Sequence, residues 1–283
     1  MKKTLFLGVI LSIVFLATFV LAVKVPTDVV PSNGHAIVNI PSHAVEVSPG
    51  VFDLGLSFDE QSGKVVQGYA FTLKSDINNA KGGIPGKPGN GGGDSGTSSC
   101  YGFIAKGTKW KVNENYIVDT SNIDSLEDSY IRNNLDLDIQ KWEDAASYNI
   151  IGNEVAGIVD IADVGVTTDG KNEIFFADIS GTNTIGLTIV WGIFGGPLSG
   201  RQIVEVDQIY NDFDFDWTQD ALIETTKMDF ESIATHELGH SMGMDDLYTS
   251  TCSQMTMYGY GSEGETYART LEDGDINGIS RLY

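Results

Sequence analysis

The chain has 283 residues, of which 41% are hydrophobic and 20% are charged. Its 17 basic and 39 acidic residues give a formal net charge of −22. The hydrophobic fraction is sufficient for a folded core, which excludes a wholly disordered chain. The acidity argues against non-specific binding to nucleic acids or anionic lipids, because both need basic surfaces.

The acidic excess lies entirely in the C-terminal two thirds of the chain. Residues 1–96 contain seven basic and seven acidic residues, whereas residues 97–283 contain 10 basic and 32 acidic residues. The length suits one large domain or two smaller ones. The uneven charge favours two chemically different parts.

The N-terminus has the pattern of a secretory signal. Two lysines precede an apolar run over residues 5–23, and Val20 and Ala22 are the small residues expected before a cleavage site. We therefore expect a signal peptide over residues 1–22 and a secreted, extracellular protein. The alternative is an uncleaved N-terminal helix that anchors the chain, because the run nearly reaches membrane-spanning length.

Short β-strands are predicted after this signal. Four segments rich in Val, Ile, Phe and Leu are separated by turn signals such as Pro-Gly; they are residues 35–40, 44–47, 51–58 and 64–73. We expect residues 23–81 to form a small all-β N-terminal domain, which could be a propeptide, a targeting module or a binding module. Residues 82–97 are dominated by Gly and Pro, which predicts a flexible linker.

The chain contains two cysteines, Cys100 and Cys252. Export makes a disulfide chemically feasible, and an even count without a Cys-x-x-Cys pair favours a single bridge. The alternative is two unrelated buried thiols. A bridge would connect the start of the acidic part to a loop near its end.

The main candidate site lies in residues 228–246. Apolar residues recur there at helical spacing, which predicts a helix that carries His236 and His240. Residues four apart share one helical face, so both rings can present a nitrogen to one ion. Glu237 lies between them and can reach a water on that ion, as in zinc hydrolases.

A turn after the helix can supply a third ligand. Gly243 can adopt the left-handed conformation that ends a helix, which would let Asp246 return to the same ion. Three protein ligands and a water are typical of a catalytic zinc site. Cobalt or manganese could occupy the same ligands. The alternative is that the short pattern arises by chance on an amphipathic helix.

The segment His236-Glu-Leu-Gly-His240-Ser-Met-Gly243-Met-Asp-Asp246 resembles the extended zinc motif of the metzincin metalloproteases. Residues 254–261, Gln-Met-Thr-Met-Tyr-Gly-Tyr-Gly, are similar to the metzincin Met-turn. The resemblance places Met257 under the zinc, with Met255 as the other candidate. Residues 271–283 resemble the closing helix of matrixin catalytic domains.

The resemblance covers about residues 100–283 and implies a matrixin-like α+β fold for residues 98–283. Such a fold has a mixed, mostly parallel twisted sheet with an antiparallel edge strand, an active-site helix and a C-terminal helix. Residues 110–118, 123–147 and 202–211 are compatible with its first strand, its long helix and a later strand. The substrate-binding edge strand would comprise Leu187, Thr188, Ile189, Val190 and Trp191.

Three departures from the matrixin pattern stand out. The third ligand of most matrixins is a histidine, whereas Asp246, or Asp245 after a shift of register, occupies that position here. Residues 97–235 contain no histidine, so the histidine-bound second zinc of vertebrate matrixins is excluded. Residues 23–99 contain no cysteine, which excludes a cysteine-switch propeptide.

The resemblance implies a zinc-dependent endopeptidase in which Glu237 acts as general base. Tyr258 or Tyr260 could donate a hydrogen bond in the transition state, or simply pack the turn. Residues 247–262 would form the specificity pocket. We expect polypeptide substrates, no nucleic acid, no stable membrane partner after signal cleavage, and a monomer.

Calcium is a second expected cofactor. Asp212, Asp214 and Asp216 place carboxylates at alternate positions, and residues 160–173 contain further acidic side chains. Calcium takes six to eight oxygen ligands, but a solvated acidic surface explains the same pattern. Two other functions also stay open: a catalytically idle zinc-binding surface module, and a zinc hydrolase of a non-peptide substrate.

Overall fold

The computed structural model describes residues 36–76, 99–181 and 183–283. The predicted signal peptide over residues 1–22 and the predicted linker over residues 82–97 lie outside these ranges. Within them, no helix combines the length and hydrophobicity needed to cross a bilayer.

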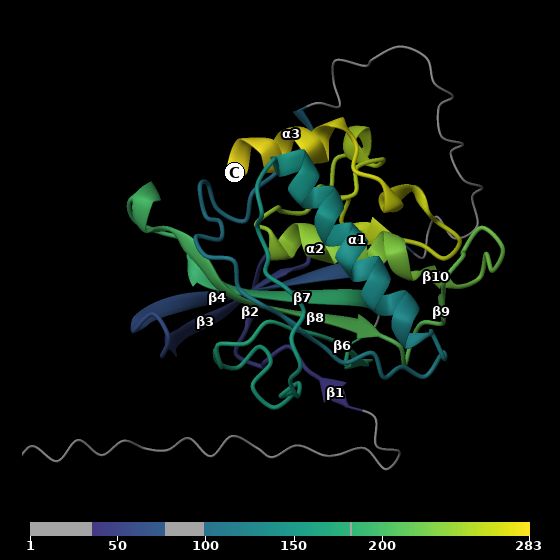
Figure 1. Cartoon of the computed structure of the whole chain (residues 1–283), viewed down its shortest axis with the longest axis horizontal. Helices are drawn as coiled ribbons and strands as arrows, with labels where there is room; N and C mark the ends of the chain where they lie inside the picture. Colours follow the sequence, from purple (N-terminus) through teal and green to yellow (C-terminus); the bar gives the residue numbers. More distant parts are fainter. Residues whose placement is uncertain (1–35, 77–98, 182) are drawn as a thin grey trace, which may run out of the picture.

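A curled mixed sheet forms the centre of the fold (Figure 1). The spatial order of its main strands is β1 (Ile37–Val38), β6 (Glu173–Ile179), β8 (Gln202–Asn211), β7 (Thr184–Ile193), β4 (Lys64–Ser75), β3 (Val51–Asp59) and β2 (Val45–Ser48). β6 is parallel to β1 and β8, whereas every pairing from β8 through to β2 is antiparallel.

Four short strands complete the β-structure of the described residues. β5 (Ile117–Val118) is parallel to β6, and β11 (Tyr260–Gly261) is parallel to β4. β9 (Trp217–Thr218) and β10 (Met228–Asp229) form a separate parallel pair.

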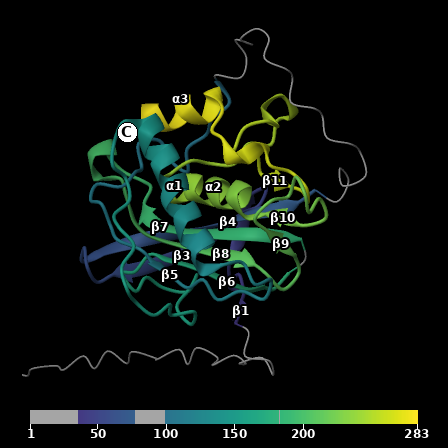
Figure 2. The ribbon, with the colours of Figure 1, turned by 45° about the vertical axis from the view of Figure 1, so that its right-hand side comes forward.

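The three α-helices lie together on one side of the sheet (Figures 1 and 2). They are α1 (Asp128–Ala146), α2 (Phe230–Ser241) and α3 (Asp273–Leu282). The described residues also form the short 3₁₀ helices η2 (Leu198–Gly200), which lies in the connection between β7 and β8, η3 (Ser250–Cys252) and η4 (Tyr267–Arg269). The indole of Trp142 in α1 donates to the Thr235 carbonyl of α2 at 2.9 Å, which joins the two helices. The predicted α+β class is confirmed.

Each face of the sheet has its own hydrophobic core. The first lies between the sheet and the helices and includes Trp142, Tyr210 and Phe230. The second lies on the opposite face and includes Phe175 and Trp191. Because side chains alternate along a strand, β4 contributes to both cores, and its residues Phe71, Leu73, Val66 and Ala70 are all buried.

The strands expected in residues 35–73 form close to their predicted positions, but the prediction of a separate β-domain is wrong. β4 pairs with β7 from Gln67 to Lys74, so the N-terminal strands extend the central sheet. A strand with apolar side chains on both faces must be covered on both faces. The central sheet and its two cores provide that cover.

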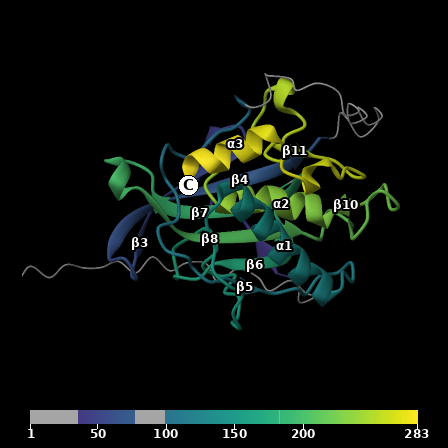
Figure 3. The same cartoon turned by 45° about the horizontal axis from the view of Figure 1, so that its top comes forward.

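The expected edge strand is also an interior strand. β7, which contains Leu187, Thr188, Ile189, Val190 and Trp191, lies between β8 and β4 (Figure 3). The prediction of a free edge at these residues is therefore wrong for the folded chain, because β4 already satisfies the outer hydrogen bonds of β7. Elsewhere, Cys100 and Cys252 form a disulfide with a Cα–Cα distance of 5.6 Å.

Candidate metal centre and active site

The helix that carries the candidate ligands has a fixed start. Asp229 precedes α2, and its carboxylate accepts hydrogen bonds from the N–H and the hydroxyl of Ser232 at 3.0 and 2.9 Å. Such a cap satisfies backbone donors that a helix leaves free at its first turn. Arg269 also donates to the same carboxylate at 2.8 Å. The cap sets the orientation from which α2 projects its histidines.

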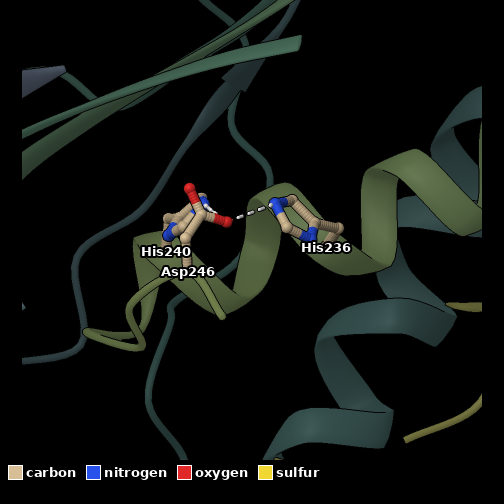
Figure 4. A group of neighbouring side chains, drawn as sticks. All are labelled: His236, His240 and Asp246. Atoms are coloured by element: carbon tan, nitrogen blue, oxygen red, sulfur yellow. Dashed lines mark ion pairs between the residues drawn. The ribbon is translucent and has the colours of Figure 1, made fainter. Parts of the chain in front are cut away.

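The third candidate ligand returns to the helix through a turn, as the sequence predicts. Gly243 has a φ of 99°, and its N–H donates to the His240 carbonyl at 2.8 Å. The turn places Asp246 Oδ1 3.3 Å from His236 Nε2 and 3.5 Å from His240 Nε2 (Figure 4). The three side chains are buried. The two histidines precede the turn on α2, and Asp246 follows it.

Asp245 does not join this group. Its carboxylate accepts from the Asp246 N–H at 3.0 Å, and its own N–H donates to the Gly102 carbonyl at 3.1 Å. In the part of the chain that the structure describes, His236, His240 and Asp246 form the one group of three side chains with metal-ligand spacing. Asp246 is therefore the carboxylate that the fold brings to the histidines.

The hydrogen bonds of the two rings leave one nitrogen of each free for a metal. His236 Nδ1 donates to the Thr256 carbonyl at 2.7 Å, and His240 Nδ1 donates to the Met244 carbonyl at 3.0 Å. Both Nε2 atoms and Asp246 Oδ1 are buried without a hydrogen-bond partner. Three buried acceptors around one point are unfavourable unless a cation lies between them. Two imidazoles and a carboxylate are a ligand set that fits zinc.

The electrostatics of the cluster also favour a cation. Burial opposes a charge on His240, but the Asp246 carboxylate outweighs it and raises the pKa of His240 to about 9. Burial raises the pKa of Asp246, yet the two imidazoles lower it far below its usual range. The site thus favours a positive charge in a buried space. A divalent metal supplies this charge while both imidazole rings stay neutral.

Glu237 lies beside the ligands and is fully buried. Its Oε2 accepts a hydrogen bond from Thr188 Oγ1 at 2.5 Å, whereas its Oε1 has no partner. Burial raises the pKa of Glu237, and the neighbouring His236 and His240 partly offset this. Gly186 on β7 leaves the space that the carboxylate needs, because a Cβ there would collide with Oε1.

The two candidate Met-turn residues have different neighbours. Met257 is buried against α2, where a Cβ at Gly239 would collide with its sulfur. Met255 instead packs against Cys100 and Cys252. The structure thus places Met257 beneath the ligand helix, and the intervening Thr256 supplies the carbonyl that orients His236.

Sequence reasoning missed two side chains that support the site. The Tyr248 hydroxyl lies 3.0 Å from Asp246 Oδ2 and donates to the Pro49 carbonyl at 2.6 Å. Asp275 of α3 accepts from the N–H groups of Thr256 at 2.9 Å and Met257 at 3.3 Å. No local pattern marks either role, because each depends on contacts between distant segments.

The remaining candidates are the two tyrosines and the predicted calcium ligands. Tyr258 and Tyr260 line a pocket beside His236. The structure does not gather the predicted calcium ligands: Asp212 accepts from a backbone N–H at 2.9 Å and Asp214 from an amide side chain at 3.1 Å. Neither they nor Asp216 form a ligand group within the described residues. Calcium stays a prediction.

Comparison with known families agrees with this geometry. Residues 196–283 match the Matrixin family model, Peptidase_M10. The match spans α2, the three ligands, the Met-turn and α3. No curated protein matches the chain significantly.

The family match and the His-His-Asp group together support a zinc metallopeptidase in general. Within that class, the part of the chain from residue 196 to residue 283 is similar to the matrixins.

Proposed function

We propose that the protein is a secreted zinc-dependent endopeptidase with Glu237 as its general base. The observation that carries the proposal is the buried ligand group with Glu237 beside it, whose Oε1 has no partner in the protein. Such an arrangement provides a metal position and a proton acceptor in one dry site.

The residues have distinct roles in hydrolysis. His236 Nε2, His240 Nε2 and Asp246 Oδ1 would hold the zinc, which supplies Lewis acidity to the scissile carbonyl and acidifies the attacking water. Glu237 takes a proton from that water and passes it to the leaving amine. Thr188 holds the carboxylate in place through its 2.5 Å hydrogen bond. We assign Tyr258 and Tyr260, which line the adjoining pocket, as candidate donors to the developing oxyanion.

Replacement of the base tests this function. We expect Glu237→Gln to lower casein cleavage about 10²- to 10⁴-fold, the usual contribution of a general base, while zinc content stays near one per chain. Glu263→Gln is the matched control, since Glu263 is exposed near the Met-turn. The assay is run on the full chain. Activity of Glu237→Gln equal to that of the wild type would refute the mechanism.

Secretion is supported by the Cys100–Cys252 disulfide, because such bonds persist in oxidising compartments. We expect the exported protein to begin at Val23 when its N-terminus is determined by mass spectrometry. An exported protein that begins at Met1 would instead support the uncleaved anchor. Substrates are polypeptides in general, in keeping with the matched family, and we propose that the protein acts as a monomer.

The two alternatives predict different outcomes in the same assay. An idle zinc-binding module does not need Glu237, yet this carboxylate is buried and held by Thr188. Burial of a carboxylate costs free energy, and an idle module would not need to bear this cost. The buried position of Glu237 therefore favours catalysis. A hydrolase of a non-peptide substrate would bind zinc and leave casein intact.

A further inference from the structure

The third candidate ligand does not lie on the helix that carries the other two. α2 ends at Ser241, and Asp246 follows in a segment that forms neither helix nor strand. A side chain on such a segment keeps its position less precisely than one on a helix, unless other parts of the chain hold it. Two distant segments contact the backbone beside Asp246, one on each side.

The first segment comprises residues 100–104, which we call the anchor segment. It runs antiparallel to the turn after α2, with Phe103 opposite Met244. The Asp245 N–H donates to the Gly102 carbonyl at 3.1 Å. The two backbones approach closely here, because a Cβ at Gly102 would lie 3.2 Å from the Asp245 Cβ. The anchor segment therefore fixes the residue directly before the third ligand.

The second segment is the Met-turn, which fixes the residue directly after the ligand. The Leu247 N–H donates to the Met257 carbonyl at 2.8 Å, and the Leu247 carbonyl accepts from the Gly259 N–H at 3.0 Å. The Met-turn is itself held to α3 by Asp275. The anchor segment, by contrast, belongs to no helix or named strand. It is therefore the weaker of the two supports of Asp246.

One covalent bond holds the anchor segment in place. Its first residue, Cys100, is joined to Cys252 over a sequence separation of 152 residues. Cys252 lies in η3, between the third ligand and the Met-turn, and Leu247 packs against the cysteine pair. Without the bond, docking of the anchor segment must overcome the entropy of closing this long loop. The disulfide therefore favours the backbone pairing at Asp245.

The disulfide lies just below the protein surface. Cys100 and Cys252 are 5% and 7% exposed, and the neighbouring Thr249, Ser250 and Thr251 are exposed. Because thiol–disulfide exchange depends on access to the sulfur, a small dithiol needs only a local opening of this loop. The bond is thus a point at which the redox state of the solvent acts on the segment that carries the third ligand.

We propose that the Cys100–Cys252 disulfide is a redox switch of the metal centre, which positions Asp246 as a ligand only while the bond is intact. A dithiol reverses the switch. One of its thiolates attacks a cysteine sulfur and breaks the S–S bond, and its second thiol completes the exchange. Two electrons and two protons pass to the cysteines, which become thiols, and the dithiol becomes a cyclic disulfide.

Reduction then releases the anchor segment and leaves Asp246 with support on one side only. Zinc affinity falls, because a misplaced carboxylate no longer completes the ligand set of two histidines and one oxygen. The inference rests on the proposed function and adds its regulation. The metal centre is completed only in an oxidising compartment, so the peptidase becomes active after export.

Hydrogen exchange of the full-length, zinc-loaded protein tests release of the anchor segment. We expect the Asp245 and Ile104 amides to exchange at least about 10-fold faster after reduction with dithiothreitol, since each bonds across the pairing. The Met242 amide bonds to α2 itself and should not change. Unchanged exchange at Asp245 and Ile104 would show that the anchor segment stays docked without the disulfide and would overturn the proposal.

Zinc affinity, measured by competition with a chromophoric chelator, tests the consequence. We expect the double variant with Cys100→Ser and Cys252→Ser to bind zinc about 10-fold more weakly than the oxidised wild type, the usual effect of removing the support of a ligand. Reduced wild type, separated from the dithiol by gel filtration, should match the double variant. Ser250→Ala, at an exposed position of η3, is the control and should bind zinc like the wild type. Equal affinities in all four proteins would overturn the switch.

A further variant tests whether the disulfide acts through the third ligand. Asp246→Ala has no carboxylate to position, so reduction should change its zinc affinity less than about 2-fold, a non-additivity that reports coupling. An equal loss in Asp246→Ala and the wild type would show that the bond only stabilises the fold. If Asp246→Ala does not fold, the visible spectrum of the cobalt-substituted wild type replaces it. Reduction should then change the cobalt bands, and an unchanged spectrum would overturn the proposal.

The outcomes separate this inference from the peptidase function. Weaker zinc binding after reduction, with no casein cleavage by the oxidised chain, would support the switch and refute the peptidase function. Casein cleavage at equal rates by the oxidised and reduced chains, with equal zinc affinity, would support the peptidase function and overturn the switch.

Discussion

At the residue scale, every group that would touch the metal or the water has a second partner that fixes its direction. Backbone carbonyls hold His236 and His240 through their Nδ1 atoms, and the Tyr248 hydroxyl lies against Asp246. Such outer contacts orient ligands and tune their basicity. Glu237 of α2 differs, because the hydroxyl of Thr188 on β7 holds it.

That difference makes Thr188 a test of the base. Thr188→Val keeps the shape of the side chain but removes the donor to Glu237 Oε2. A hydrogen bond to the charged form lowers a carboxyl pKa, so its loss raises the pKa of Glu237 further above its ordinary value. Since the base acts when ionised, the acid limb of the kcat/KM profile moves to higher pH, with about a 10-fold loss on that limb.

The profile is measured with a quenched peptide as substrate. Thr184→Val, four residues away on β7, is the control and leaves the acid limb in place. An unchanged limb in Thr188→Val would show that the hydroxyl does not set the ionisation of Glu237.

The sequence could identify His236, Glu237 and His240 because their relation is local to one helix. It could not choose between Asp245 and Asp246. That choice depends on the turn at Gly243 and on the Gly102 carbonyl, which captures the Asp245 N–H from far away in the sequence. Tertiary contacts therefore decide which of the two carboxylates reaches the metal position.

At the element scale, the Met-turn is held by the closing helix. Asp275 lies at the N3 position of α3, where its carboxylate accepts from the Glu272 N–H at 3.0 Å as part of a capping box. The same carboxylate accepts from Thr256 and Met257. One buried side chain therefore joins the start of α3 to the turn under the metal.

Asp275→Ala should weaken both elements. It leaves three backbone N–H groups without their acceptor, and we expect the free energy of unfolding to fall by about 3 kcal/mol. Zinc affinity should fall about 10-fold, because Thr256 orients His236. Urea unfolding and chelator competition measure the two effects. Asp273→Ala, at an exposed position of the same turn, is the control, and equal losses in both variants would contradict the role of Asp275.

The strands show where sequence patterns stop being informative. Runs of β-branched and aromatic residues located β3 and β4 closely, because strand formation follows local composition. The same composition did not predict the pairing partner of β4, since β4 pairs with a strand more than a hundred residues later. The buried apolar residues on both faces of β4, such as Ala70 and Phe71, are typical of an interior strand. A local pattern cannot say which strand lies alongside.

At the scale of the whole molecule, the net charge of −22 includes carboxyl groups that the fold buries. Glu173, Glu205 and Asp207 are each at most 3% exposed near one end of β6 and β8. Backbone N–H groups of Asp169 and Gly170 donate to Glu205 Oε2 at 3.0 and 2.6 Å. Even so, burial raises the pKa of Glu205 to about 8 and that of Asp207 well above its ordinary value.

These groups predict how stability depends on pH. The pKa of a Glu in an unfolded chain is about 4.3, whereas burial raises the pKa of Glu205 in the folded protein to about 8. Between these values the folded state holds a proton that the unfolded state releases, so the free energy of unfolding falls as pH rises. We expect the Tm of the zinc-saturated protein to fall from pH 5 to pH 8. Glu205→Gln, which keeps an acceptor without the charge, should flatten this fall.

Calorimetry at several pH values measures the effect, with exposed Glu60→Gln as the control. A Tm that rises from pH 5 to 8, equally in Glu205→Gln and the wild type, would contradict the assignment.

The same titration tests the calcium expected at residues 160–173. A cation bound among these carboxylates would stabilise their charged forms and lower their pKa values, so added calcium would abolish or reverse the fall in Tm.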